Sequence, residues 1–196
     1  MESFGVGADA EVSDAYKVFI TQEVDGRSVT VVGYIGEGSA TELTAAWDSP
    51  FAEDSAGASF SKAGGAIQSI SQDEQDGGLT SVSTWNSQQV WSGNSPISHN
   101  FTLYLKAYAD ANREVDLAIK ELKKMASPEL NSNMIGGRTP QVVTLNIGRQ
   151  RIYQNIVIET VGHEEDAPKT PDRFFTRNTV TLSLQAKGVV NRSQIR

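Results

Sequence analysis

Residues 101–128, FTLYLKAYADANREVDLAIKELKKMASP, carry the strongest strand and helix patterns of the sequence, one directly after the other. Apolar and polar residues alternate from Phe101 to Tyr108, which predicts a strand with one buried face. Asp110 or Asn112 can cap the helix that follows, and Pro128 is expected to end it. The apolar residues of this helix fall on one face, namely Val115, Ala118, Ile119, Leu122, Met125 and Ala126. A strand that leads into an amphipathic helix therefore forms the centre of the predicted fold.

Strands are predicted on both sides of this unit. Asp25-Gly26 and Gly148-Arg149-Gln150 are tight-turn sequences, and each lies between two runs rich in β-branched and aromatic residues, so each marks a hairpin. The predicted strands are Tyr16–Gln22, Ser28–Ile35, Gln141–Ile147, Arg151–Val161 and Phe174–Ala186, with shorter ones at Ala66–Ser71 and Leu79–Trp85. This order predicts an α+β or barrel-like fold of mainly antiparallel strands, and not a Rossmann or TIM pattern.

The segment 36–65 has a different composition. Gly, Ala and Ser dominate it, and its large apolar residues are Leu43, Trp47, Phe51 and Phe60. A loop of this length inside a compact domain is usually functional or disordered, and the aromatic residues indicate that it docks on another surface. We therefore predict one domain over residues 1–196, with a long loop or insertion at 36–65.

Several classes of function are disfavoured by what the sequence lacks. It contains no cysteine, which excludes disulfides, thiolate catalysis and thiolate metal sites. Its first residues are polar and acidic, unlike a signal peptide, and no run approaches the roughly 18 apolar residues of a membrane helix. We expect a soluble protein that is not exported by a signal of its own and does not insert into a membrane.

Charge is distributed unevenly along the chain. The net charge of −7 argues against a nucleic-acid clamp held by phosphate contacts. Residues 1–130 carry 8 Lys/Arg against 19 Asp/Glu, whereas residues 131–196 carry 9 against 5. Unlike surfaces on one chain can attract each other between copies, and head-to-tail contacts of that kind produce rings or stacked rings when the rotation closes. The alternative is that the acidic loops only maintain solubility.

Candidate catalytic and metal-binding residues form no complete set. Ser98 and His99 are neighbours, but adjacent residues of a strand point to opposite faces, so His99 is interpreted as a strand-edge residue. The run His163-Glu164-Glu165-Asp166 lacks the spacing of a zinc site, and Asp73, Glu74 and Asp76 do not match a calcium loop. The glycines of residues 33–38 do not have the order of a nucleotide-binding fingerprint. We therefore predict no catalytic residue, metal or cofactor, and a small hydrolase or carbohydrate-binding domain stays only a remote alternative.

Aromatic residues with polar neighbours suggest contacts with another chain. Such side chains bury a large area with few rotatable bonds and are favoured at interfaces, although core packing explains them equally well. The predicted subunit-interface residues are Trp47, Phe51, Trp85, Trp91, Pro96, Arg149 and Arg151.

Two segments resemble proteins of tailed bacteriophages. WSGNSPISHNFTLYLKAYADANREVDLAIKELKKMASPEL, residues 91–130, is similar to a segment of baseplate and tail-tube proteins. In those proteins a Trp-small-Gly stretch leads to a strand ending in Ala-Tyr-x-Asp, and an amphipathic helix closed by a proline follows. The run from Pro140 to Gln185 likewise resembles their closing strands. The resemblance covers about half of the chain.

The resemblance implies a hexameric ring stacked in a phage tail. The implied fold is a tail-tube-like β-sandwich or half-barrel with one flanking helix, whose sheets join around a lumen for DNA. The implied partners are other copies of the chain and the neighbouring baseplate and tail-tube proteins, in a virion assembled in the host cytoplasm. The insertion at 36–65 favours a baseplate adaptor that joins the hub to the tube and nucleates the tube. A major tail-tube subunit or a tail terminator is the alternative.

Polar faces of the long strands are the candidates for the lumen side. An acidic lumen would repel the DNA phosphates, so the genome would slide through without specific binding. The predicted lumen-facing residues are Thr144, Asn146, Thr179, Thr181 and Ser183.

Overall fold

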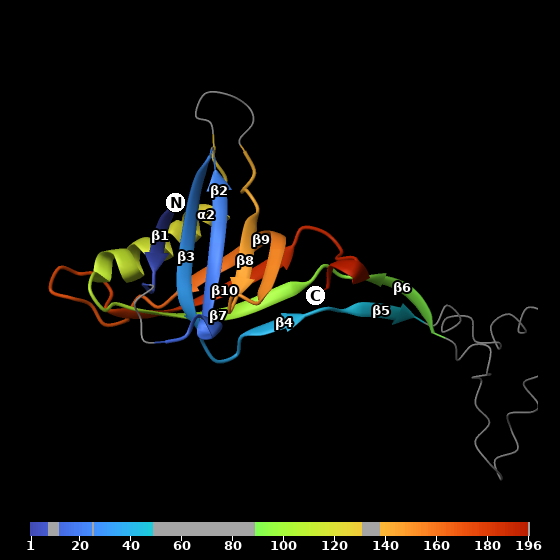
Figure 1. Ribbon diagram of the computed structural model, residues 1–196, viewed down its shortest axis with the longest axis horizontal. Coiled ribbons are helices and arrows are strands. Elements are labelled where there is room, and N and C mark those ends of the chain that lie inside the picture. Colours follow the sequence, from blue (N-terminus) through green and yellow to red (C-terminus); the bar gives the residue numbers. More distant parts are fainter. Residues whose placement is uncertain (8–11, 25, 49–88, 131–137, 196) are drawn as a thin grey trace, which may run out of the picture. The chain divides into compact units, whose positions relative to one another are not determined.

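The computed structural model describes residues 1–7, 12–24, 26–48, 89–130 and 138–195 (Figure 1). The chain divides into two units. The first consists of Met1–Leu43 and Pro96–Arg196, and the second consists of Thr44–Ser95.

Six strands of the first unit close into a barrel. Around the barrel they run in the order β3, β2, β8, β9, β10 and β7, and β7 pairs with β3 again. Each neighbouring pair is antiparallel. The strands are β2 (Lys17–Val24), β3 (Arg27–Ile35), β7 (Ser98–Lys106), β8 (Val143–Ile147), β9 (Arg151–His163) and β10 (Arg177–Ala186). The prediction of a mainly antiparallel α+β fold is therefore confirmed.

Two short strands extend the sheet beside the place where the barrel closes. β1 (Glu2–Gly5) runs parallel to β3, and β4 (Ala40–Glu42) runs antiparallel to β7. The closing pairing of β3 with β7 contains two residue pairs, whereas β7 and β10 share nine. Gly36 makes the close approach possible, because a Cβ atom there would lie 2.8 Å from the carbonyl oxygen of Thr102.

The predicted strand and helix of residues 101–128 are both present. Asp110 caps the helix, since its Oδ1 accepts hydrogen bonds from the backbone N–H groups of Asn112 and Arg113 at 3.0 and 3.2 Å. One π-helical turn, η2 (Asn112–Asp116), continues into α2 (Leu117–Ala126). The helix ends because Ser127, which precedes Pro128, is extended.

The core lies between the helix and the inward faces of the strands. Alternation along β7 and β10 buries every second side chain, and the apolar face of α2 joins the same cluster. Fully buried members of this cluster are Val18, Ile20, Val31, Leu103, Leu105, Val115, Ala118, Leu122, Leu145, Val180 and Leu184. Burying this face holds the helix against β9 and β1.

Both predicted hairpins form at the expected turns. β2 and β3 meet around Gly26, whose φ is +77°, while Asp25 lies outside the described residues. β8 and β9 meet at Gly148 and Arg149, with φ values of +60° and +55°. Short 3-10 helices precede β2 (η1, Asp14–Tyr16) and follow β10 (η3, Arg192–Gln194).

The first part of the predicted loop at 36–65 is not loop throughout. Ala40–Glu42 forms β4, and Ala45–Asp48 forms β5, which pairs with β6 (Val90–Asn94) in the second unit. Periodicity does not indicate these strands, because they are short and lack alternating apolar residues. Residues 49–65 lie outside the described residues, as do the predicted strands Ala66–Ser71 and Leu79–Trp85. The single domain and the extent of the insertion stay predictions.

Candidate functional site

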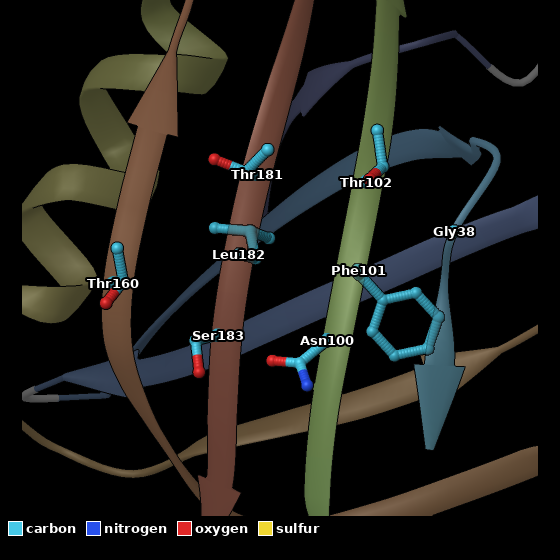
Figure 2. Close-up of a pocket in the computed structure, with 8 residues that line it drawn as sticks. All are labelled: Gly38, Asn100, Phe101, Thr102, Thr160, Thr181, Leu182 and Ser183. Carbon is cyan, nitrogen blue, oxygen red and sulfur yellow. The ribbon is translucent and has the colours of Figure 1, made fainter. Parts of the chain in front are cut away.

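A shallow pocket of about 260 Å³ lies on the outer face of the barrel (Figure 2). The strand register builds it, because Thr181 lies opposite Thr102, and Ser183 lies opposite both Asn100 and Thr160. None of its lining residues is charged, and most offer hydroxyl or amide groups. The lining residues are Gly38, Asn100, Phe101, Thr102, Thr160, Thr181, Leu182 and Ser183. The lining can form hydrogen bonds, and one charged group borders it, because the Ser183 hydroxyl donates to Glu159 Oε2 at 3.4 Å.

The five predicted lumen residues all lie on the side of their strands that faces away from the core. Thr144 and Asn146 alternate with the buried Val143 and Leu145 of β8. Thr179, Thr181 and Ser183 alternate in the same way with the buried residues of β10. β9 separates the two strands, and of the five residues only Thr181 and Ser183 line the pocket of Figure 2.

Asn146 differs from the other four predicted lumen residues. Its side-chain oxygen is buried and makes no hydrogen bond to any described residue. A lumen-facing position would give this oxygen water partners, so Asn146 fits the prediction less well than the β10 residues.

Two of the predicted interface residues, Trp47 and Trp91, lie opposite each other in the β5–β6 pair. Their side chains are 56% and 54% exposed, although both are large and apolar. The indole N–H of Trp91 donates to the Asn94 Oδ1 at 3.1 Å, which holds the ring on the strand. Two exposed indole rings on neighbouring strands form a surface suited to contact with another protein. Phe51 and Trp85 lie outside the described residues.

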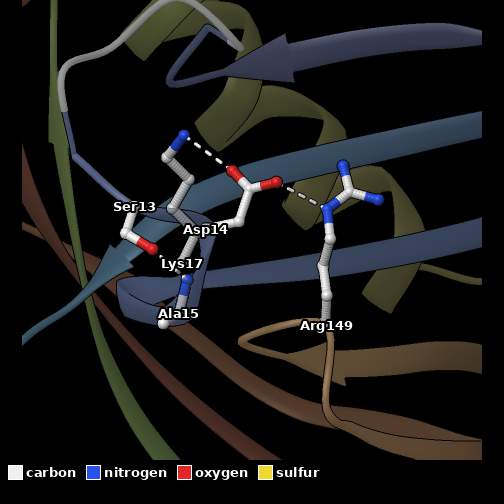
Figure 3. Close-up of polar contacts among 5 residues, drawn as sticks. All are labelled: Ser13, Asp14, Ala15, Lys17 and Arg149. Atoms are coloured by element: carbon white, nitrogen blue, oxygen red, sulfur yellow. Dashed lines mark hydrogen bonds and ion pairs between the residues drawn. The ribbon is translucent and has the colours of Figure 1, made fainter.

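Arg149, another predicted interface residue, belongs to a polar cluster formed within the chain (Figure 3). Its Nε donates to Asp14 Oδ2 at 2.6 Å, and Lys17 Nζ donates to Asp14 Oδ1 at 2.9 Å. The guanidinium also lies 4.5 Å from the centre of the Phe19 ring. The hydrogen bonds from Lys17 and then Arg149 lower the pKa of Asp14 below its usual value. We call Asp14, Lys17 and Arg149 the Asp14 clasp.

The clasp joins the segment before β2 to the β8–β9 turn. Besides the ion pairs, the N–H of Gly148 donates to the carbonyl oxygen of Lys17 at 2.9 Å. No local sequence pattern indicates this contact, because Asp14 and Arg149 are 135 residues apart. Of the remaining predicted interface residues, Arg151 is exposed at the start of β9, and Pro96 is half-buried before β7.

His99 is not a strand-edge residue, contrary to the prediction. Its side chain is completely buried on the core face of β7. Nδ1 is hydrogen-bonded to the Thr41 hydroxyl at 2.9 Å, and Nε2 has no partner among the described residues. Burial lowers the pKa of His99 to about 4. Because its hydrogen-bond partner is Thr41, His99 is not arranged to activate Ser98.

The run His163-Glu164-Glu165-Asp166 begins at the last residue of β9 and brings two of its own side chains together. His163 Nε2 lies 2.9 Å from Glu165 Oε1. Within the described ranges, no group of three or more His, Cys, Asp or Glu side chains is placed to hold a metal ion. Asp73, Glu74 and Asp76 lie outside those ranges. None of the helices in the described part of the chain has the length and hydrophobicity needed to span a membrane.

No protein-family model matches the sequence, and no curated protein matches it.

Proposed function

We propose that this protein is a structural ring protein of a bacteriophage tail baseplate. In this proposal six copies form a ring that joins the central hub to the tail tube, nucleates the tube and surrounds a lumen for DNA. The proposal starts from the resemblance of residues 91–130 and 140–185 to baseplate and tail-tube proteins. The observation that supports it most is the architecture of these same residues, in which long antiparallel strands pack on one helix.

The outer face of β10 and β7 supports a role as the lumen wall. Its central residues are Thr102, Thr181, Ser183 and Asn100, and none of them carries a charge. Binding of DNA to proteins depends largely on cations that neutralise phosphates. A wall of hydroxyl and amide groups would therefore stay hydrated and let a duplex pass without holding it.

The Trp47–Trp91 pair supports contact with a neighbouring chain. Exposing a large apolar side chain to water costs more free energy than exposing a small one. Two Trp side chains that are more than half exposed therefore favour burial against a partner. Head-to-tail contact between unlike surfaces is the type of interface that closes into a ring.

Two alternatives belong to the same class of virion protein. A major tail-tube subunit or a tail terminator would use the same barrel and the same outer face of β7 and β10. The insertion predicted at 36–65 favours the baseplate adaptor, because a repeating tube subunit needs less chain outside its barrel. A small hydrolase or carbohydrate-binding domain is the remote alternative from another class.

Electron microscopy of the phage particle tests the proposal most directly. We expect density for this chain as a six-fold ring between the hub and the first ring of the tube. Mass photometry of the purified protein, alone and with the neighbouring baseplate and tube proteins, is the solution counterpart. A chain that stays monomeric under both conditions and binds saccharides would contradict the ring and favour the remote alternative.

A further inference from the structure

His99 is a titratable group enclosed by the core side of the barrel. Four elements contribute the groups around its ring: Thr41 from β4, Tyr153 from β9, Leu184 from β10 and Phe101 from β7 itself. The ring centre of Tyr153 lies 4.5 Å from that of His99. Apart from His99, only the Tyr153 phenol among these groups is titratable. Glu42 of β4 lies opposite Ser98 in the strand pairing. Among the described residues, no carboxylate forms an ion pair with His99.

A proton on this ring would be costly where the ring now lies. Nε2 is buried and has no acceptor within reach among the described residues, so the added N–H would have no partner. The charge would also be withdrawn from water without a counter-ion, which is the physical cause of the lowered pKa of His99. A protonated ring is therefore stabilised only if water reaches it.

β4 is the least firmly held of the elements around the ring. It shares three residue pairs with β7, and all three of its side chains are exposed. β10, on the other edge of β7, shares nine pairs and buries alternate side chains in the core. Within the described residues, the bond from Thr41 to His99 is the one side-chain hydrogen bond between β4 and β7. Because β4 contributes no buried side chain to the core, moving it aside exposes no apolar core residue that belongs to β4.

We propose that His99 is an acid-sensitive anchor for β4. Protonation of the ring releases β4 from β7 and admits water to Nε2, while the other strands of the barrel stay paired. β4 ends at Glu42, two residues before Thr44, where the second unit begins along the chain. The anchor does not depend on the proposed role in a phage tail.

Amide hydrogen exchange of the whole chain across pH 8 to pH 5 tests this inference. Exchange rates are divided by the intrinsic rates, so that only protection is compared. A histidine pKa that rises from about 4 to about 6.5 on release predicts that protection of the β4 amides falls by about 30-fold at pH 5. Protection of the β7 and β10 amides that pair with each other is expected to stay constant over this range.

The sequence offers a matched control, because His163 is its only other histidine. His163→Gln should keep the pH-dependent loss of β4 protection. His99→Phe should abolish the pH dependence, with β4 less protected than in the wild type at pH 8, since the bond to Thr41 is gone. His99→Gln serves the same purpose if the Phe variant does not fold, because the amide does not titrate and can still bond Thr41.

Three results would overturn the anchor. The first is constant protection of β4 in the wild type. The second is the same loss of protection in the wild type and in the His99 variants. The third is simultaneous loss in β4, β7 and β10, which would indicate global unfolding. Each of these leaves the proposed ring untouched, because ring assembly is read separately by mass photometry.

Discussion

The Asp14 clasp illustrates how a buried cation is accommodated at the scale of single residues. The Lys17 side chain is 2% exposed, whereas those of Asp14 and Arg149 are 41% and 64% exposed. A buried ammonium group is tolerated only with a partner that carries the opposite charge. Asp14 is that partner, and Arg149 holds its carboxylate in place.

Asp14→Asn should lower the stability of the protein, because it leaves the Lys17 ammonium without an anionic partner. The expected result is a lower urea midpoint at pH 7 with an unchanged slope, measured by circular dichroism. The pKa of Asp14 is lowered on folding, so its contribution is present above the unfolded-state value of 3.8 and is lost as the pH falls through the folded value.

Asp172→Asn is the matched control for this variant, since Asp172 is an exposed aspartate outside the clasp. It should leave the urea midpoint within experimental error. Equal midpoints for the two variants at pH 7 would show that the clasp contributes nothing to stability.

At the scale of elements, the closing pairing of β3 with β7 depends on Gly36. Gly36→Ala would place a methyl group 2.8 Å from the Thr102 carbonyl oxygen, which is backbone and cannot turn away. We expect a loss of about 1–3 kcal/mol in the free energy of unfolding, the usual cost of overpacking. Gly188→Ala meets no atom within 4 Å and should be nearly neutral. Equal stability of the two variants in urea denaturation would contradict the close approach of β3 to β7.

The β5–β6 pair is the element on which the predicted subunit contact depends. Replacing both Trp47 and Trp91 with Ser should weaken assembly by at least about tenfold in concentration, because buried Trp residues commonly dominate interfaces. The measurement is mass photometry over a dilution series, with circular dichroism to verify the fold. Val189→Ser removes a side chain that is 58% exposed outside this pair, and it should assemble as the wild type does. Assembly of the double variant at wild-type concentrations would exclude these indoles from the interface.

At the scale of the whole molecule, the uncharged centre of the outer face, around Thr181 and Ser183, makes the lumen testable. Thr181→Lys with Ser183→Lys would add two cations per copy to the wall and give assembled rings a salt-sensitive affinity for linear duplex DNA. Fluorescence anisotropy at low and high salt measures this, and wild-type rings should bind only weakly. The control is the double variant Gly188→Lys with Val189→Lys, which adds the same two cations per copy outside β10. Closed circular DNA cannot thread a ring, so lysines in a lumen should favour linear DNA. If both double variants bound closed circular DNA as tightly as linear DNA, the β10 face would not line a lumen.

Part of this architecture could be predicted from the sequence, because local physics determines it. Alternation along residues 101–108 and 177–186 encodes which face of each strand is buried, and the structure follows it. The helix begins and ends where Asp110 and Pro128 require. Gly26 and Gly148 mark both hairpins, since positive φ values cost glycine little.

Only the tertiary structure decided which strands meet. Periodicity specifies a buried face but not its partner, so the closing pairing of Tyr34 with Tyr104 and the short strands β1 and β4 left no local signal. The burial of His99 depends on the strands that pack over it. The Asp14–Arg149 pair depends on two segments, distant in the sequence, that the barrel brings together. The sequence by itself determined the faces, turns and helix ends, because these depend on neighbours along the chain. Closure of the barrel and the surroundings of its polar residues depend on long-range contacts, and these exist only in the folded protein.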